Sequence, residues 1–271
     1  MATSDNPINE FGTKRLGSFN WSGFQTLYEK EVRRYCKVFG QTVGAPVVTT
    51  LMFMMIFTLA LGGSGRYIGE IPYATFLAPG LIIMSILQNS FANTSSSIIG
   101  SKMQGNIVDI LLAPIGAKEI SLGYALGGIT RGLMVGLFVM MAMFFMADIS
   151  FIHIWAILYF SISGAMMLSL LGTMTGIWGQ RFDQTSAINN FVIMPLSFLS
   201  GTFYSIERLS GVWFSISQLN PFFYLIDGFR YGFTGQAEAN PMIGVIYILV
   251  LNIILWFITY RMFKSGYKLR A

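Results

Sequence analysis

Long runs of apolar residues alternate with short polar connections along most of this chain. Six runs come close to the roughly 20 residues that a helix needs to cross a hydrocarbon core of about 30 Å. Because lipid offers no hydrogen-bond partners, a spanning segment must satisfy its own backbone groups, as a helix does. We therefore predict an all-α polytopic membrane protein with six transmembrane helices. Their expected ranges are 42–62, 73–99, 120–147, 152–178, 187–205 and 242–262.

The composition agrees, with 54% hydrophobic and 11% charged residues and a mean hydropathy of +0.62. After six spans, the 271 residues leave no room for a globular domain of ordinary size. We expect a six-span domain over 41–263. The first residues are polar and lack the apolar core of a signal peptide, so we expect 1–18 to be a disordered cytoplasmic segment. We expect 264–271 to be a cytoplasmic tail.

Basic residues are distributed unevenly between the two sides of the predicted bundle. A net charge of +5 is compatible with nucleic-acid binding, but these residues cluster at span ends, as the positive-inside rule describes. We therefore expect no nucleic-acid partner. With six spans, thirteen Lys and Arg residues lie on the same side of the membrane as the two termini, and three lie on the opposite side. Both termini are expected to be cytoplasmic.

Residues 19–40 predict an amphipathic helix before the first span. Aromatic and aliphatic residues recur at three- and four-residue steps, and charged residues fill the other face. This profile is typical of a helix that lies in the headgroup plane, although packing on a cytosolic partner fits it too. The expected interfacial residues include Trp21, Phe24, Tyr28 and Tyr35.

A polar stripe follows one face of the second predicted span. Ser85, Asn89, Asn93 and Ser97 stand four residues apart and therefore share a face. Amide groups without partners are costly in hydrocarbon, so this face must meet another helix or a wet cavity. Two interpretations stay open: interhelical hydrogen bonds, worth about 0.6 kcal/mol each, or the lining of a translocation path.

Glycines at four-residue spacing mark the third and fourth predicted spans and allow helix backbones to approach closely. We expect packing within one subunit, with a dimer seam as the alternative. The residues are Gly128, Gly132, Gly136, Gly172 and Gly176.

Arg131 lies within the third predicted span. A charge at that depth costs about 2.5–3.5 kcal/mol on insertion scales and usually marks function or a buried pair. We expect Arg131 to take a structural or gating role in an ion pair, with snorkelling to the cytoplasmic face as the alternative.

The segment 204–235 is too charged for a clean span and too apolar for a free loop. Its aromatic residues suit a membrane interface. We expect re-entrant half-helices in the outer leaflet, where protein or water can cover non-helical backbone. Asp227 and Arg230, three apart on a helix, are expected to form an ion pair.

The loop between the second and third predicted spans contains a short helix within 102–116. Asn106 is expected to cap it, Asp109 lies in its first turn, and Pro114 follows its end. Ile107, Ile110 and Leu111 provide an apolar face. Such a helix has the form of a docking element, and a connector lying on lipid is the alternative.

Motifs for chemistry are missing from the sequence. It has no GxxxxGK[ST] phosphate loop, so it does not bind ATP by that route. A single cysteine, Cys36, supports neither a disulfide framework nor a metal site. The predicted spans have no Asp or Glu at their centres to couple proton or sodium movement. If the protein moves a substrate, its energy source lies elsewhere.

These features together resemble the type-2 ABC exporter permeases over nearly the whole chain, including nodulation-factor and capsular-polysaccharide exporters. The stretch GNIVDILLAPIGAKEISLGYALGGITRG resembles the cytoplasmic loop and third span of that family. The stretch PLSFLSGTFYSIERLSGVWFSISQLNPFFYLIDGFRYG resembles its signature region. Within the second stretch, Pro221, Phe222, Tyr224 and Arg230 match the family pattern.

The resemblance implies a homodimer in a bacterial inner membrane, in contact with lipids and with two separate ABC ATPase subunits. ATP and Mg²⁺ would bind those subunits, and this chain would hold no cofactor and catalyse no reaction. Residues 102–116 would be the coupling helix. The substrate would be an amphipathic lipid, lipid-linked glycan or drug-like molecule, exported along spans one, two and five. The alternative is an ATP-independent scramblase or assembly scaffold.

Overall fold

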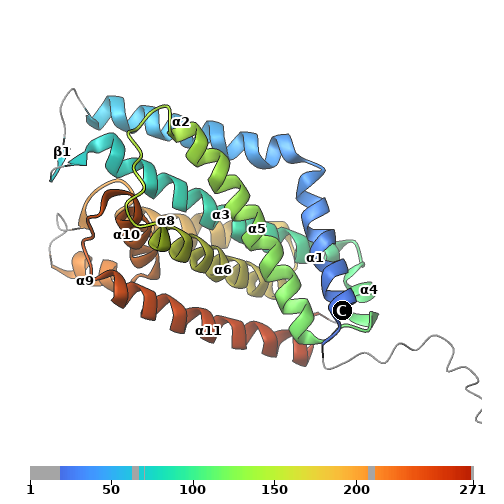
Figure 1. Ribbon diagram of the computed structural model, residues 1–271. Coiled ribbons are helices and arrows are strands. Elements are labelled where there is room, and N and C mark those ends of the chain that lie inside the picture. The colour runs from blue at the N-terminus through green and yellow to red at the C-terminus, as the bar shows by residue number, and fades with distance from the viewer. Residues whose placement is uncertain (1–18, 63–66, 70, 207–210, 270–271) are drawn as a thin grey trace, which may run out of the picture.

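A computed structural model describes residues 19–62, 67–69, 71–206 and 211–269. Over these residues the chain is almost entirely helical, in agreement with the predicted class (Figure 1). The expectation of disorder at 1–18 concerns residues outside that part of the chain.

The elements follow one another as a helical bundle with one short hairpin. The strands β1 (Tyr67–Ile68) and β2 (Ile71–Pro72) pair antiparallel, with Tyr67 opposite Pro72. The sequence analysis did not predict this hairpin. The helices are α1 (Trp21–Cys36), α2 (Phe39–Gly62), α3 (Tyr73–Met103), α4 (Ile107–Leu112), α5 (Ala117–Met143), α6 (Ile154–Trp178), α7 (Phe182–Ile188), the π-helical η1 (Asn189–Ile193), α8 (Met194–Leu199), α9 (Val212–Leu219), α10 (Pro221–Thr234) and α11 (Pro241–Ser265).

Five helices of the described chain are long and apolar enough to cross a membrane: α2, α3, α5, α6 and α11. They correspond to five of the six predicted spans. The remaining prediction, 187–205, is wrong as a single regular helix. Three helical pieces, α7, η1 and α8, follow one another there. The last piece ends at Leu199, six residues before the predicted end of the span. A sixth span made of these three pieces stays a prediction.

Pro195 gives the physical reason for this irregularity. Proline lacks a backbone N–H, and its ring clashes with the carbonyl one turn earlier in a regular helix. The π-helical turn η1 comes just before it, and the N–H of Met194 donates to the oxygen of Asn189 instead of to a residue four positions back. The wider turn therefore accommodates the proline without ending the helix.

α3 lies at the centre of the bundle, with α5 and α6 packed against it (Figure 1). Glycines make this packing possible. A Cβ atom on Gly132 would lie 2.8 Å from the carbonyl oxygen of Ile86, and one on Gly176 would lie 3.2 Å from that of Ser95. Both glycines face α3 of the same chain, so the glycine spacing is explained by packing within one subunit.

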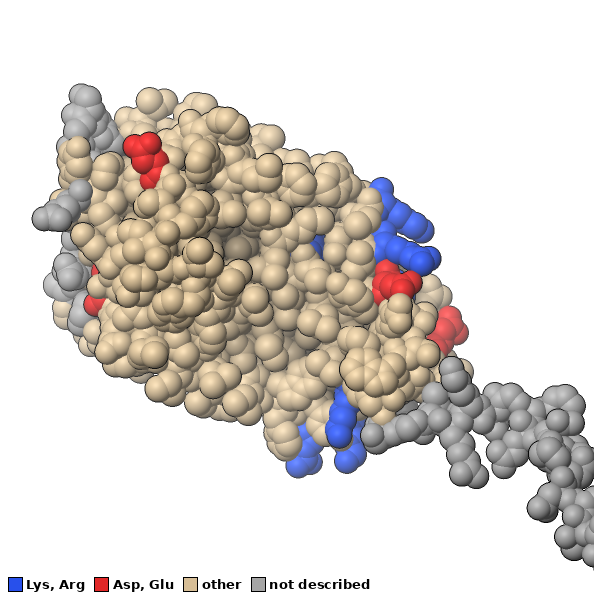
Figure 2. Space-filling view, in the orientation of Figure 1, with Lys and Arg blue, Asp and Glu red and all other residues tan. Residues whose placement is uncertain are grey.

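The bundle has two distinct ends (Figure 1). One carries α1, α4 and the C-terminal end of α11, and we refer to it as the α4 end. The opposite end carries β1, β2, α9 and the start of α11, and we refer to it as the hairpin end. Figure 2 shows Lys and Arg gathered at the α4 end. On the face in view, no described Lys or Arg is visible at the hairpin end.

Within 204–235, the described residues include two short helices, α9 and α10, joined at Asn220. The Asn220 side chain accepts from the N–H of Phe222 and donates to the carbonyl oxygen of Leu196. It therefore caps α10 and ties it to α8. Two half-helices were expected here, and their depth in a membrane stays a prediction.

Candidate functional site

α4 is a six-residue helix that follows a tight turn at the α4 end. Gly105 takes a φ of 78° in that turn. Asn106 was expected to cap the helix, and this prediction is wrong: its backbone is already helical, and its amide donates to Gln104 Oε1 at 3.2 Å. A side-chain cap needs the more extended backbone of a typical first residue. Asp109 lies in the first turn, as expected.

α4 carries apolar residues on two sides, and the side that was predicted to form the docking face is turned inward. Ile107 is buried, and Ile110 and Leu111 pack beside it in an apolar cluster with residues of α1, α3, α5 and α11. The side that faces outward carries Val108, 50% exposed, and Leu112, 79% exposed. Met103, at the end of α3, is also exposed, at 57%. We refer to Met103, Val108 and Leu112 as the α4 patch.

Asn20 joins α1 to the loop after α4 and to the first turn of α5. Its side-chain oxygen accepts from Gly23 N at 3.0 Å, which caps α1, and its amide donates to Pro114 O at 2.7 Å. Its backbone N–H donates to Glu119 Oε1 at 3.0 Å. A groove of about 620 Å³ lies between α1 and α4 beside this junction, and Asp109, Ile110 and Pro114 help to line it. Motion of α4 is therefore tied to α1 and α5.

α1 runs alongside the first half of α5. Leu27 faces Gly123, Glu31 faces Gly127, and the Tyr35 hydroxyl lies 3.2 Å from that of Thr130. Tyr35 was predicted to be interfacial, but it is only 4% exposed. This burial raises the pKa of its phenol.

The other predicted interfacial aromatics lie away from this contact. Trp21 is 71% exposed. Its ring lies 6.0 Å from that of Phe24, which in turn stacks at 6.5 Å on Tyr28. These three residues form the outer aromatic face that the sequence predicted, and their position relative to lipid stays a prediction.

A buried polar network lies between α1 and the half of α3 nearest α4. Glu31 is fully buried and accepts from Ser97 Oγ at 2.6 Å. Arg34 contacts Glu31 at 3.3 Å. From Nη2 it also donates to both the backbone and the side-chain oxygen of Asn93, each at 2.7 Å. This half of the polar stripe therefore holds α1 in place.

The sequence analysis missed Glu31 and placed Arg34 among the charged residues of the solvent face. A signal was present for Glu31. It lies midway between Leu27 and Tyr35, four residues from each, so all three share a helix face. A charge between two apolar residues on one face indicates a buried, paired group.

The other half of the stripe lines a groove of about 230 Å³ between α2 and α3. The Ser85 hydroxyl lies 3.2 Å from that of Thr50, and Asn89 donates to the Ser85 carbonyl. Gln88 also lines this groove, and its buried amide nitrogen has no partner within the described chain. Ser85, Gln88 and Asn89 therefore give this groove a polar wall.

A second polar groove, of about 220 Å³, lies between α3 and the α7–η1 segment. Ser95 and Ser96 of α3 line one side, and Asn189 and Asn190 of η1 line the other. α3 thus separates two polar grooves, toward α2 on one side and toward the irregular helix on the other.

The predicted ion pairs differ from the observed contacts. Arg131 forms no ion pair within the described chain, and its buried Nε has no hydrogen-bond partner there. The carboxylate of Asp227 accepts from the N–H groups of Glu238 and Ala239, both at 3.0 Å. The pairing of Asp227 with Arg230 is therefore replaced by bonds to the backbone that follows α10.

Arg230 connects several parts of the hairpin end. Its guanidinium donates to Gly201 O at 2.6 Å, lies 3.7 Å from the centre of the Phe76 ring, and contacts Glu238 at 4.0 Å. Glu238 accepts from Ile206 N at 2.9 Å. Burial raises the pKa of this carboxyl, an effect that the nearby Arg230 opposes. These contacts join α3, α10 and the loops around them.

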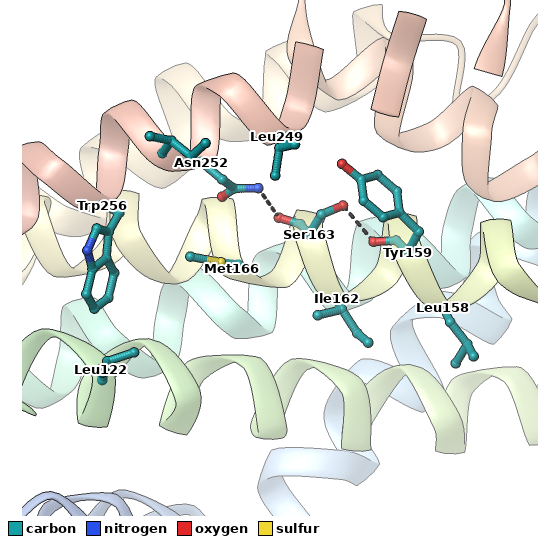
Figure 3. A pocket seen from close by; sticks show the side chains of 10 residues that line it. Leu122, Leu158, Tyr159, Ile162, Ser163, Met166, Leu249, Asn252 and Trp256 are labelled. Atoms are coloured by element: carbon teal, nitrogen blue, oxygen red, sulfur yellow. Dashed lines mark hydrogen bonds between the residues drawn. The ribbon is translucent and has the colours of Figure 1, made fainter. Parts of the chain in front are cut away.

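An apolar groove of about 530 Å³ lies between α5, α6 and α11 (Figure 3). Its polar groups are largely occupied. The Asn252 amide donates to Ser163 O at 3.0 Å, and the Ser163 hydroxyl donates to Tyr159 O at 2.6 Å. Leu158 and Leu249 on its walls are about half exposed. This groove suits apolar chains and offers no polar path.

Comparison with known proteins decides the family. The family model described as ABC-2 type transporter matches residues 22–234, from α1 through α10. The chain belongs to the ABC-2 type transporter family. The resemblance drawn from the two sequence stretches is thus confirmed, and the match includes α4, the polar stripe and Arg230.

Individual relatives of this ABC-2 transporter chain are similar over most of their length. It is 34% identical over 253 residues to the inner membrane transport permease YadH of Escherichia coli K12, which covers 93% of this chain and 98% of that protein. The YadH protein of Shigella flexneri matches equally. Nodulation protein J of Rhizobium leguminosarum bv. viciae is 26% identical over 219 residues, or 76% of this chain and 83% of that protein.

Proposed function

We propose that this chain is the permease subunit of an ATP-driven ABC exporter in a bacterial inner membrane. It acts as a homodimer with two separate ABC ATPase subunits, which bind ATP and Mg²⁺. The family match and the name transport permease, carried by a 34% identical relative, support this role. The absence of a phosphate-loop motif from the sequence supports nucleotide binding on another chain.

The α4 patch is the observation that carries the proposal. Its three apolar side chains are at least half exposed, at the end of the bundle where Lys and Arg gather. Exposed apolar surface of this kind marks contact with a protein or a membrane. The positive-inside rule assigns the Lys- and Arg-rich end to the cytoplasm. Both termini and α4 then face the compartment that contains ATP.

The contacts of α1 provide a route for coupling. α4 is tied through Asn20 to α1 and α5, and α1 is tied through Arg34 to Asn93 of α3. A conformational change of the ATPase can thus reach the centre of the bundle through hydrogen-bonded elements. It drives transport only if the ATPase binds two permease conformations with different affinity.

The grooves beside α3 support a path along α2, α3 and the α7–α8 segment. The groove toward α2 combines Ser85, Gln88 and Asn89 with apolar residues such as Phe53 and Leu81. A lining of this mixed kind suits an amphipathic substrate such as a lipid, a lipid-linked glycan or a drug-like molecule. Export is the direction that the family resemblance implies.

The test is reconstitution with a candidate ABC ATPase subunit. The chain is expected to co-purify with that ATPase and to raise its turnover in liposomes. Failure of the two proteins to associate, together with full transport by the chain alone, contradicts the proposal.

One observation favours a second function, an ATP-independent scramblase. Gln88 lines a polar groove between two candidate spans, beside Ser85 and Asn89, where a lipid headgroup can bind. This function predicts nucleotide-free lipid movement by the purified chain in liposomes, and a reduced rate for Gln88→Leu. A permease that depends on its ATPase predicts no such movement.

A further inference from the structure

A basic groove lies along one face of α1. It encloses about 590 Å³ and is lined by Thr26, Glu29, Lys30, Arg33, Arg34 and Lys37. Four of these residues are cations and one is an acid. Because positions 30, 33, 34 and 37 are three or four apart, their side chains share one face of the helix.

The charges of this groove are not balanced within the described chain. Arg33 pairs with Glu29 at 3.1 Å, and Arg34 contacts the buried Glu31. Lys30 and Lys37 have no acidic partner within ion-pair distance among the described residues. Arg34 is also fixed by two bonds to Asn93. The groove therefore holds an excess of positive charge on a partly rigid frame.

One end of the groove adjoins the start of a candidate span. The candidate span α2 begins at Phe39, directly beyond Lys37. The other end of α1, at Asn20, contacts the loop after α4. A rise of 1.5 Å per residue places Lys30 about 15 Å further along α1 than Asn20. The Lys37 end of the basic groove thus adjoins a candidate span, and its other end shares Thr26 and Lys30 with the groove between α1 and α4.

We propose that this groove binds the phosphate group of an anionic phospholipid. Basic residues at the cytoplasmic end of a span attract anionic headgroups. An arginine offers paired N–H donors that match phosphate oxygens, and a lysine adds a mobile point charge. Lys30 and Lys37 supply unpaired charge at the two ends of the groove, and Arg33 lies between them.

The test compares two variants that lose the same charge. Lys30→Gln/Lys37→Gln alters the groove, and Arg261→Gln/Lys264→Gln removes two exposed cations at the end of α11. The purified full chain in neutral detergent is titrated separately with phosphatidylglycerol, phosphatidylcholine and inorganic phosphate. Bound ligand is counted by native mass spectrometry.

We expect the wild-type chain to bind phosphatidylglycerol more tightly than phosphatidylcholine. Each basic residue near an anionic surface contributes about 1 kcal/mol, so the groove variant should bind about 30-fold more weakly. The α11 variant should bind like the wild type. Inorganic phosphate alone should bind far more weakly, because it lacks the acyl chains that hold a lipid beside α2.

Three results overturn the inference. Equal losses in both variants indicate non-specific attraction. Equal affinity for inorganic phosphate and phosphatidylglycerol indicates a free-phosphate site. Equal affinity of the wild-type chain for phosphatidylglycerol and phosphatidylcholine shows that the groove does not select an anionic headgroup. The measurement on the isolated chain needs no ATPase, so its failure is distinct from failure of the proposed function.

Discussion

Arg34 on α1 donates from one guanidinium nitrogen to both oxygens of Asn93 on α3, at 2.7 Å each. The same guanidinium contacts the fully buried Glu31. The amphipathic helix is therefore held to the centre of the bundle by a charged, hydrogen-bonded network.

The network predicts that Arg34→Gln destabilises the chain. The substitution leaves the buried Glu31 carboxylate without its counter-ion, which should cost about 3 kcal/mol of stability. This value is at the lower end of the range for broken buried pairs, because Arg34 is itself partly exposed. Thermal unfolding in detergent, followed by tryptophan fluorescence, measures the change. The control Arg33→Gln removes an exposed pair and should cost less than about 1 kcal/mol. Equal effects of the two variants would refute a stabilising role for the Arg34 network.

The α4 patch predicts that Leu112→Asp weakens ATPase binding. A charge placed on an exposed apolar anchor at the centre of an interface costs about 2 kcal/mol or more, or roughly 30-fold in affinity. The measurement is a pull-down titration of the ATPase, with thermal stability checked in parallel. Leu112→Met keeps the apolar surface and should bind normally. Normal binding by Leu112→Asp would show that the ATPase contacts another surface.

Close packing against α3 predicts that Gly132→Ala is destabilising. The added methyl group would meet Ser90 and the backbone oxygen of Ile86, which cannot move freely. Overpacking of this kind costs about 1–3 kcal/mol. Gly44 of α2 is the matched control, because a Cβ there has no neighbour within 4 Å, so Gly44→Ala should be neutral or slightly stabilising. Unfolding in denaturing detergent measures the stability of both variants. An unchanged stability of Gly132→Ala would exclude tight packing at this position.

Glu238 predicts a pH dependence at the hairpin end. Burial raises the pKa of its carboxyl in the folded chain, despite the neighbouring Arg230. A group with a raised folded pKa contributes stability below its ordinary pKa and loses it as pH rises through the folded value. The midpoint temperature of unfolding should therefore fall as the pH rises above the usual range of glutamate pKa values. The Glu238→Gln variant should lack this fall. Asp227 also raises the pKa of Glu238, and it is unchanged in both the wild type and the Glu238→Gln variant.

Much of the architecture follows from the sequence because membrane spans obey a one-dimensional rule. A run of apolar residues of sufficient length predicts a helix without reference to its neighbours, and five helices appear where such runs predicted them. The predicted fifth span is not one regular helix, because a π-helical turn precedes Pro195. The average hydropathy of the segment gives no sign of this irregularity. The family resemblance also came from sequence, since it depends on the order of residues in two stretches.

Contacts between helices were decided only by the tertiary structure. Ile107 and Leu112 are equally apolar in sequence, but the rotation of α4 against α1 buries the first and exposes the second. The polar stripe is continuous along α3, and α1 covers one half of it while α2 and a groove meet the other. The pattern on one helix states which residues share a face. What that face meets depends on the rotation and height of its neighbours, which arise from packing among all the helices together.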